Sequence, residues 1–408
     1  MKTDTTFKIR AYQTWQKFLK TFVPFKQPEM YSRTGAIDDI NHVLLHKKHQ
    51  VHNVLIVTGS QIYKKNLINP IFENLKRNGI NYSVYSGCKP NPTAEQVEEG
   101  VLLYKKNRCE AIIAIGGGSV IDVAKCIGAR AGNSKTPLSE MVGVMKVKND
   151  IPLLIAIPTT AGSGSDASFT AELLDSKNGS KYSIVDPKLL PKYVLLDPNL
   201  IIDLNKEQIA FSGMDALTHA IEAYLSKAHT MKSDRFAIDG AKLICDNLEL
   251  AYSNNEHDKN ALKLHENLLN GAYYAGLALS RAYAGFCHAI SHAIGGKYNL
   301  PHGYLNAIIL PYVLKAYGDS ATERLAKLAD QIAYRISTNN TKKAEWLINR
   351  IESMNSYLGI KNNLKDVIDP KEIHALAARA YEEATPLYPA PKMLDIVEIE
   401  NIINDLIK

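Results

Sequence analysis

One Asp and several His residues of the chain recur at a spacing that suits a metal ion. Asp215 and His219 stand four residues apart, and His288 and His292 repeat that spacing. On a helix, side chains four residues apart share one face. His302 follows within the stretch Leu-Pro-His-Gly. Carboxylate and imidazole groups are ligands for Fe²⁺, Zn²⁺ or Mn²⁺, so this spacing predicts a metal site.

Chance also produces such pairs, because the chain contains 12 His residues. Four of them recur at a similar spacing in a polar segment that we interpret as solvated: His42, His46, His49 and His52. The stretches around Asp215 and His288 differ, because their flanks are apolar and rich in glycine. This context favours a metal site over a solvated helix face.

Two loops rich in glycine and hydroxyl groups predict a nucleotide site. Ile115–Ser119 contains three glycines and joins a predicted strand to a predicted helix. There, bare backbone and the free N–H groups of the helix can approach a phosphate. We expect Ser119 to cap this helix and Asp122 to lie in its first turn. Ile157–Asp166 follows another predicted strand, and Pro90–Thr93 is a candidate third wall. Since ligands of α/β sheets bind at the carboxyl ends of strands, these loops should meet.

The elements that carry these residues divide the chain into two halves. β-Rich runs at residues 53–58, 82–86, 109–115, 151–157 and 193–196 alternate with helical stretches such as 94–106. This alternation predicts βαβ units and a mainly parallel sheet. After residue 203, helical periodicity takes over, at residues 215–227, 231–249, 258–279, 302–317, 321–336 and onward. We therefore predict an α/β dinucleotide-binding domain over residues 1–204 and an all-helical, metal-binding domain over residues 205–408.

The composition is that of an ordinary globular protein. Of the 408 residues, 46% are hydrophobic and 22% are charged, with a net charge of +6, which excludes disorder, collagen and coiled coil. The basic residues are spread along the chain, so we expect no nucleic-acid partner. No run reaches the roughly 18 apolar residues of a membrane span, and the N-terminus lacks the apolar core of a signal peptide. Five Cys residues without a CxxC pair fit a reducing cytoplasm, and we expect a cytoplasmic protein that does not enter a membrane.

With these motifs in hand, the chain resembles the iron-containing alcohol dehydrogenase family. Four similar stretches follow one another in family order: Gly116–Lys125, Pro158–Ser165, Gly213–Tyr224 and His288–Gly303. The last two are highly specific, and together the four span about residues 53–320. The first ~50 and last ~80 residues carry no motif that we can match.

The resemblance implies a dehydroquinate synthase-like fold, with a nucleotide-binding α/β domain, a helical domain and a cleft between them. The family's metal ligands fall on Asp215, His219, His288 and His302. His292 matches a position near the metal that is not counted as a ligand. We expect it to be catalytic, by moving the alcohol proton to solvent, with a structural role as the alternative.

The resemblance also implies a set of cofactor contacts. The pyrophosphate positions fall on Gly117, Gly118 and Ser119, and further contacts fall on Asp122, Thr159, Thr160, Ser163 and Lys181. To these we add the loop residues Asn91 and Thr93, and Gly59 and Ser60 at the end of the first strand.

The residue after the first strand bears on the choice of nicotinamide cofactor. In family members that prefer NAD, an Asp stands where this chain has Gly59. Such a carboxylate repels a 2′-phosphate. Here Ser60 follows and Lys64 and Lys65 lie a little further on. We therefore expect NADP(H) to be used more readily than NAD(H).

These features predict a metal-dependent NAD(P)(H) alcohol dehydrogenase or aldehyde reductase acting on a small alcohol or aldehyde. Hydride would pass to or from the nicotinamide, with Fe²⁺ as the Lewis acid; Zn²⁺ also suits the donor set. One alternative is a non-redox lyase or cyclase of the dehydroquinate synthase kind on the same fold. Another is a binding protein with a vestigial nucleotide cleft. The sequence leaves the physiological substrate and a homodimer open.

Overall fold

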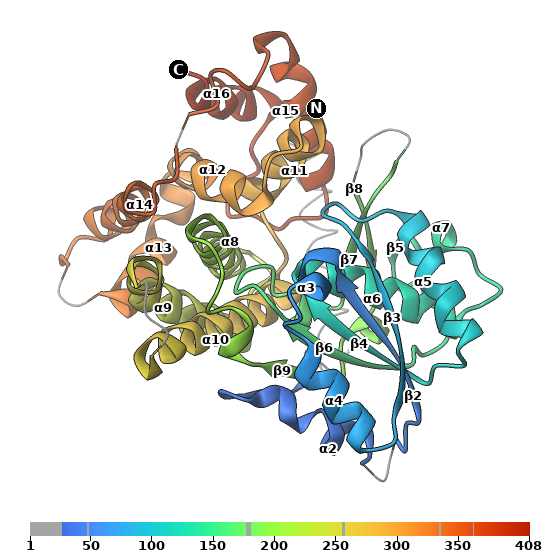
Figure 1. Cartoon of the computed structure of the whole chain (residues 1–408). Coiled ribbons are helices and arrows are strands. Elements are labelled where there is room, and N and C mark those ends of the chain that lie inside the picture. The colour runs from blue at the N-terminus through green and yellow to red at the C-terminus, as the bar shows by residue number, and fades with distance from the viewer. Residues whose placement is uncertain (1–26, 47–48, 177–180, 255–257, 334–335, 362) are drawn as a thin grey trace. The chain divides into compact units, whose positions relative to one another are not determined.

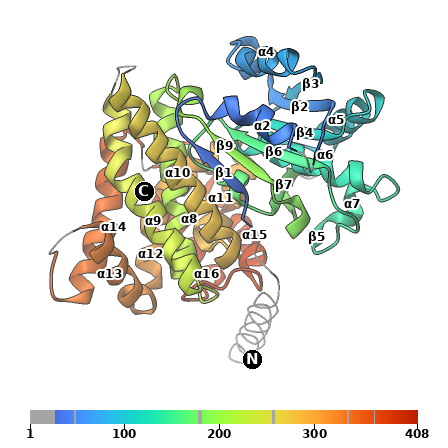
Figure 2. The ribbon, with the colours of Figure 1, turned by 90° about the horizontal axis from the view of Figure 1, so that it is seen from below.

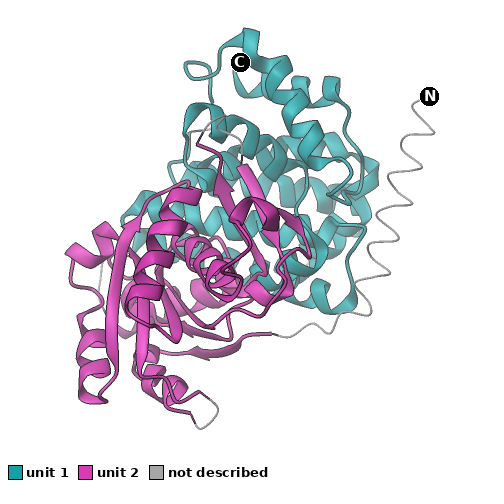
Figure 3. Ribbon diagram, turned by 90° about the vertical axis from the view of Figure 1, so that its right-hand side faces the viewer, with its two compact units in different colours: residues 1–26, 205–255, 274–408 teal, residues 27–204, 256–273 magenta. Residues whose placement is uncertain are grey.

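The computed structural model describes residues 27–46, 49–176, 181–254, 258–333, 336–361 and 363–408, which fall into two compact units (Figures 1 and 3). One unit contains residues 27–204 and 256–273, and the other contains residues 205–255 and 274–408. A single division at residue 204 therefore leaves out the first part of α10 (Lys259–Ala282), which groups with the α/β unit.

The α/β unit is built on a six-stranded sheet in the order β1-β9-β6-β4-β2-β3, and each neighbouring pair is parallel. The strands are β1 (Glu29–Ser32), β2 (Asn53–Gly59), β3 (Asn81–Cys88), β4 (Ala111–Gly116), β6 (Leu153–Pro158) and β9 (Tyr193–Leu196). The chain moves outward from β2 to β3 and then returns to place β4 beside β2. This reversal is a topological switch point, where α/β sheets bind their ligands.

Both faces of this sheet are covered by helices, which is why its central strands are almost wholly apolar. On one face, alternate residues such as Ile56 and Ile113 pack in a core with α2 (Ile40–Leu44) and α4 (Asn69–Arg77). On the other face, Ile112 contacts the helix α6 (Gly118–Gly132). The helix α5 (Ala94–Lys106) packs against α6 (Figure 1). The predicted α/β class and parallel sheet are confirmed.

A second, three-stranded sheet in this unit was not predicted. It has the order β5-β8-β7, with β5 (Gly143–Val144), β7 (Thr170–Leu174) and β8 (Lys181–Val185). Its strands are no longer than five residues, and β7 and β8 pair antiparallel. Such short runs contain too few alternations for a periodicity to stand out. The edge strand β1 was missed for the same reason. The unit also contains the short helices α3 (Ser60–Lys64) and α7 (Leu138–Met141).

The second unit is helical, and no strand follows residue 204 among the residues that the structure describes. Besides the end of α10 it contains α8 (Lys206–Leu225), α9 (Met231–Ser253), α11 (Phe286–Tyr298), α12 (His302–Tyr317), α13 (Asp319–Ile332), α14 (Asn340–Tyr357), α15 (Ile373–Ala384) and α16 (Ile396–Leu406). The helix α8 is buried over most of its length and packs against α9 and α12 (Figure 2). It begins earlier than its periodicity predicts, because Asn205 and Gln208 form a capping box. Within the described ranges, no helix is long and apolar enough to span a membrane.

A proline inside α12 is accommodated by a side chain from another helix. Pro311 has no N–H, so the carbonyl of Ala307, four residues earlier, loses its helical partner. The Nδ2 group of Asn355, on α14, donates to that carbonyl at 2.7 Å. Asn355 is only 4% exposed, so this hydrogen bond replaces one that water could not supply. It keeps α12, which begins at His302, intact within the core.

We expect Asn355→Leu to lower the free energy of unfolding by about 1–3 kcal/mol, because a buried carbonyl loses its donor. In a Pro311→Ala background, the new backbone N–H can bond Ala307, so the same substitution should cost less. Urea unfolding of the four proteins measures both costs. Equal costs in the two backgrounds would show that Asn355 does not replace the missing N–H.

Candidate functional site

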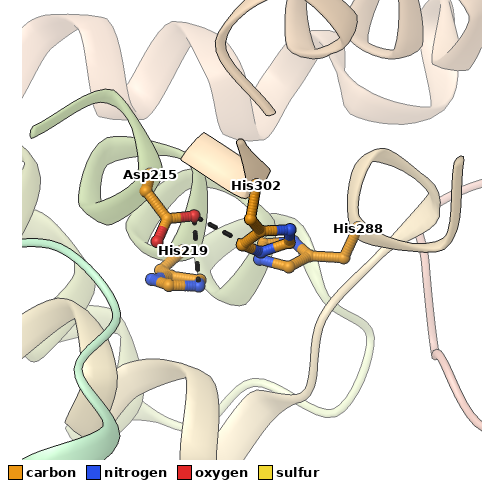
Figure 4. Close-up of side chains that lie close together, drawn as sticks. All are labelled: Asp215, His219, His288 and His302. Atoms are coloured by element: carbon orange, nitrogen blue, oxygen red, sulfur yellow. Dashed lines mark ion pairs between the residues drawn. The ribbon is translucent and has the colours of Figure 1, made fainter. Parts of the chain in front are cut away.

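Four side chains converge in the helical unit, and we refer to Asp215, His219, His288 and His302 as the Asp/His cluster (Figure 4). Each offers one ligand atom, and these atoms all lie within 4.8 Å of one another. The carboxylate oxygen Oδ1 of Asp215 is 3.7 Å from Nε2 of His219 and 3.6 Å from Nε2 of His302. The first three residues are buried and His302 is partly exposed.

Three helices bring the Asp/His cluster together. Asp215 and His219 share one face of α8, as their spacing predicts. His288 lies in the first turn of α11, and His302 is the first residue of α12. One carboxylate and three imidazoles form a donor set of the kind that binds Fe²⁺ or Zn²⁺. The residues present therefore fit a divalent metal ion.

No thiolate joins this donor set. Cys287 is next to His288 in the chain, but its Sγ points to the carbonyl of Asn306 at 3.4 Å. Burial raises the pKa of the Cys287 thiol well above its usual range. A buried, protonated thiol is a poor ligand, so the site offers nitrogen and oxygen atoms.

Sequence reasoning missed two polar residues that contact the Asp/His cluster. The Nδ2 group of Asn306 lies 2.8 Å from Oδ1 of Asp215, and 3.2 and 3.1 Å from Nε2 of His288 and His302. The carboxylate of Glu222 lies 2.5 Å from Nδ1 of His288. Both follow a cluster residue by one helical turn, since Asn306 is four residues after His302 and Glu222 three after His219. That spacing was the available signal.

His292 lies beside the cluster, and a carboxylate holds its ring. Its ring is stacked on that of His302, with 5.0 Å between centroids, while its Nδ1 is 2.7 Å from Oε1 of Glu383. Tyr388 donates its hydroxyl to the same oxygen at 2.8 Å. Glu383 and Tyr388 lie in the C-terminal part, where no motif marked them. The Glu383 carboxylate accepts a proton held on Nδ1, which leaves Nε2 of His292 as the other polar atom of the ring.

The candidate cofactor residues all lie in the α/β unit, and most follow the carboxyl ends of neighbouring parallel strands. Gly59 ends β2 and Ser60 follows it, Asn91 and Thr93 follow β3, Gly117, Gly118 and Ser119 follow β4, and Thr159, Thr160 and Ser163 follow β6. Asp122 lies within α6, and Lys181 begins β8. The residues after β2 and β4 flank the topological switch point of the sheet.

Two loops pack against each other: the glycine loop, at residues 115–119, and the hydroxyl loop between β6 and β7, at residues 159–169. A Cβ atom at Gly118 would lie 2.7 Å from Oγ of Ser163, so only glycine lets these loops come so close. The N–H of Thr159 donates to the carbonyl of Gly116 at 3.1 Å. The expected cap by Ser119 is wrong, because α6 begins at Gly118 and no side chain hydrogen-bonds its N-cap. Without a side-chain cap, the N–H groups of Gly118 and Ser119 can reach a phosphate, so the loop fits a dinucleotide.

A buried lysine joins α6 to the hydroxyl loop. The ammonium group of Lys125 donates to Oγ of Ser165 at 2.9 Å, to Oγ of Ser168 at 3.2 Å and to the carbonyl of Thr170 at 2.6 Å. Burial lowers the pKa of Lys125 to about 8, against the nearby carboxylate of Asp122. Burial likewise raises the pKa of Asp122 to about 6, against Lys125 and the Ser165 hydroxyl. Three acceptors for three protons fix the ammonium group in place.

Asp122 was expected in the first turn of α6, and the structure places it beyond that turn. Its carboxylate accepts from the Ser165 hydroxyl at 2.5 Å and from the N–H of Glu172 at 3.2 Å. The side chain of Glu172 in turn lies 4.0 Å from Nζ of Lys181. Asp122 therefore links α6, the hydroxyl loop and the small sheet that carries Lys181.

Comparisons with known proteins agree with this arrangement. Residues 28–198 match the iron-containing alcohol dehydrogenase family, and residues 209–407 match the C-terminal part of the Fe-containing alcohol dehydrogenase family. The NAD-dependent methanol dehydrogenase of Bacillus methanolicus is 32% identical over 94% of this chain and 98% of its own. The NADPH-dependent butanol dehydrogenase of Clostridium saccharobutylicum is 30% identical over 83% and 84%. A crystal structure of 1,3-propanediol oxidoreductase is similar with a TM-score of 0.88, at 28% identity over 94% and 99% of the two chains.

We expect Lys125→Met to lower the free energy of unfolding by about 3 kcal/mol or more, because it leaves the buried Asp122 carboxylate without its cation. Urea unfolding followed by circular dichroism measures the loss. The exposed Lys135→Met is the matched control, and it should change stability by less than about 0.5 kcal/mol. Equal effects of the two substitutions would contradict a structural role for the Lys125 ammonium.

Proposed function

The chain belongs to the iron-containing alcohol dehydrogenase family. We propose that its Asp/His cluster binds the divalent metal ion that the reaction of this family requires. The family makes the chain an NAD(P)-dependent alcohol dehydrogenase, an oxidoreductase acting on the CH–OH group of alcohols and the matching aldehydes. The observation that carries the ligand assignment is the convergence of four ligand atoms within 4.8 Å. No finding favours a non-redox lyase or a binding protein with a vestigial cleft.

The metal would supply a Lewis acid for the substrate oxygen, and the nicotinamide would supply or take the hydride. The chain's own residues bind and orient these groups. Asp215 contributes the one negative charge of the donor set, and the buried rings of His219 and His288 keep solvent away from it. For His292, the contact with Glu383 holds one ring nitrogen. Transfer of the alcohol proton through His292 stays a prediction, with a structural role as the alternative.

On the cofactor side, we propose that the glycine loop binds the pyrophosphate with the backbone N–H groups of Gly117, Gly118 and Ser119. The start of α6 supplies these groups together with the positive end of the helix dipole. The hydroxyl groups of Thr159, Thr160 and Ser163 lie on the neighbouring loop. They can donate to the remaining polar atoms of a dinucleotide.

The geometry at the end of β2 supports a preference for NADP(H). Gly59 ends β2 and is followed directly by α3. A Cβ atom at Gly59 would meet its nearest neighbours at 3.8 and 3.9 Å, so the position has room for a side chain and carries none. No carboxylate stands there to repel a 2′-phosphate. Lys64 and Lys65 are exposed within one or two turns.

The substrate proposal is a short alcohol or its aldehyde. The names of the similar proteins include methanol, butanol and 1,3-propanediol. The candidate substrates should therefore vary in chain length and in the presence of a second hydroxyl group. Initial rates with a series of unbranched aldehydes, alcohols and diols test this proposal. Comparable rates with bulky or charged aldehydes would contradict it.

We expect His288→Ala to weaken the binding of Fe²⁺ by more than about 100-fold and to abolish turnover, since loss of a partner outside the ligand set already costs about 10–100-fold. Metal content after anaerobic purification and the rate of NAD(P)H oxidation with a short aldehyde measure the change. The control is His42→Ala, at an exposed His outside the cluster, which should keep both. Full metal content and turnover in the His288→Ala protein would refute the ligand assignment.

We expect Gly59→Asp to shift the preference towards NADH by roughly 5–150-fold in the ratio of kcat/KM values, an effect of about 1–3 kcal/mol in a solvated site. The reason is repulsion between the new carboxylate and the 2′-phosphate. Gly59→Asn has nearly the same size without the charge and is the matched control. Steady-state kinetics with NADH and NADPH on all three proteins decide the question. A wild-type enzyme that strongly prefers NADH would contradict the proposal.

A further inference from the structure

Glu222 is a buried carboxylate that no part of the proposed mechanism uses. It lies on α8, three residues after His219, and its side chain is 1% exposed. Burying an ionised carboxylate costs several kcal/mol or more unless donors and positive charge compensate it. The partners that compensate Glu222 should therefore show what it does.

Its partners lie at the start of α11. Oε2 accepts from the N–H of Gly285 at 2.8 Å, and Oε1 accepts from the N–H of Cys287 at 2.8 Å. These N–H groups have no partner within their own helix, and the start of a helix carries partial positive charge. The carboxylate of α8 thus caps α11 across the helix interface. The next N–H, that of Phe286, donates to the hydroxyl of Tyr317 at 3.3 Å.

The same carboxylate contacts His288. Its Oε2 is 2.5 Å from Nδ1 of His288. Because an ionised carboxylate only accepts hydrogen bonds, this contact keeps the proton on Nδ1 and places the lone pair of the ring on Nε2. Nε2 is the atom that lies among the other ligand atoms, 3.2 Å from Nδ2 of Asn306. Glu222 therefore fixes both the tautomer and the orientation of the ring.

The backbone of α11 is adapted to this contact. A Cβ atom at Gly285 would lie 2.6 Å from Oε1 and 2.9 Å from Cδ of Glu222. Real Cβ atoms do not approach that closely, so any side chain at this position would push the carboxylate away. The extended backbone of Gly285 (φ −134°) is open to any residue, so the close approach is the reason for a glycine.

The Nδ1 atom of His302, another residue of the cluster, has a hydroxyl rather than a carboxylate as its partner. This atom lies 3.2 Å from Oγ of Ser291. A hydroxyl can donate or accept, so it does not choose between the tautomers of the ring. It also adds no negative charge near the metal position. Glu222, in contrast, selects the tautomer of His288 and places a negative charge near the metal position.

We propose that Glu222 is a positioning residue for the metal centre: it holds His288 with Nε2 towards the cluster and locks the start of α11 to α8. This rests on the proposed function, since it takes the Asp/His cluster as the metal site. A purely structural cap would stabilise the fold and leave metal affinity unchanged. The affinity for the metal ion therefore distinguishes a positioning role from a purely structural one.

The test compares Glu222→Gln with Tyr317→Phe. Glutamine keeps the size of the side chain, but its amide replaces one acceptor by a donor and removes the charge. Tyr317→Phe removes the hydroxyl that caps the neighbouring N–H of α11, and Tyr317 does not belong to the cluster. The dissociation constant of Co²⁺ is measured by competition with a chelator and by its visible absorption bands. Thermal unfolding of the metal-free proteins is measured alongside.

We expect Glu222→Gln to raise the dissociation constant of Co²⁺ by about 10–100-fold and to change its absorption bands. Tyr317→Phe should match the wild type in both, although both variants lose thermal stability. The affinity for NADPH, which binds to the α/β unit in our proposal, should not change in either. An unchanged Co²⁺ dissociation constant in a folded Glu222→Gln protein overturns the proposal.

If Glu222→Gln does not fold, Gly285→Ala takes its place. The added methyl group displaces the carboxylate while every charge is kept, so we expect weaker Co²⁺ binding of at least about tenfold. Unchanged Co²⁺ affinity in Gly285→Ala then overturns the proposal. A wild-type protein that binds no Co²⁺, or a His288→Ala variant that binds it normally, refutes the proposed function itself. If His288→Ala loses Co²⁺ binding as expected while the Glu222 and Gly285 variants keep the wild-type affinity for Co²⁺, this inference alone is refuted.

Discussion

Burial of ionisable groups inside a helical core is the constraint on which the rest of this structure depends. Asp215, His219 and His288 are each less than about a tenth exposed, and such groups are stable only where charge and hydrogen bonds compensate their loss of water. The Asp/His cluster meets this requirement by mutual proximity and by Asn306 and Glu222. The helices α8, α11 and α12 each contribute to the cluster, so their packing brings these polar side chains to one point.

The α/β unit also contains a buried charge that needs compensation, and this charge is positive. Lys125 is fully buried, and its ammonium group is compensated by Ser165, Ser168 and the carbonyl of Thr170. Because these acceptors lie on the hydroxyl loop and the small sheet, the shape of that loop depends on a residue of α6. In the proposed cofactor site, a buried charge thus fixes the loop beside the start of α6, where a helix N-terminus suits a phosphate.

Much of the fold could be predicted from local pattern. The strands β2, β3, β4 and β9 and the helices α5, α9 and α12 were found within a few residues, the strands as β-rich runs and the helices by their apolar periodicity. The short strands of the second sheet could not be found, since runs of two to five residues show too few alternations. The capping box at Asn205 extends α8 beyond its apolar pattern, and the cap expected from Ser119 is absent because α6 starts one residue before it.

The sequence by itself determined the family, the α/β and helical classes, and the set of Asp and His residues, because each of these depends on residue type and on spacing along one helix or loop. Only the tertiary structure decided which second residues hold that set in place. Glu222, Asn306 and Glu383 are ordinary polar residues in sequence, and they matter because helix packing carries them to a His ring or to Asp215. The physical reason is that a hydrogen bond depends on distances of a few tenths of an ångström between groups on different helices. Spacing along a single element can place a residue on the same face as a cluster residue, but it does not fix a distance to another helix.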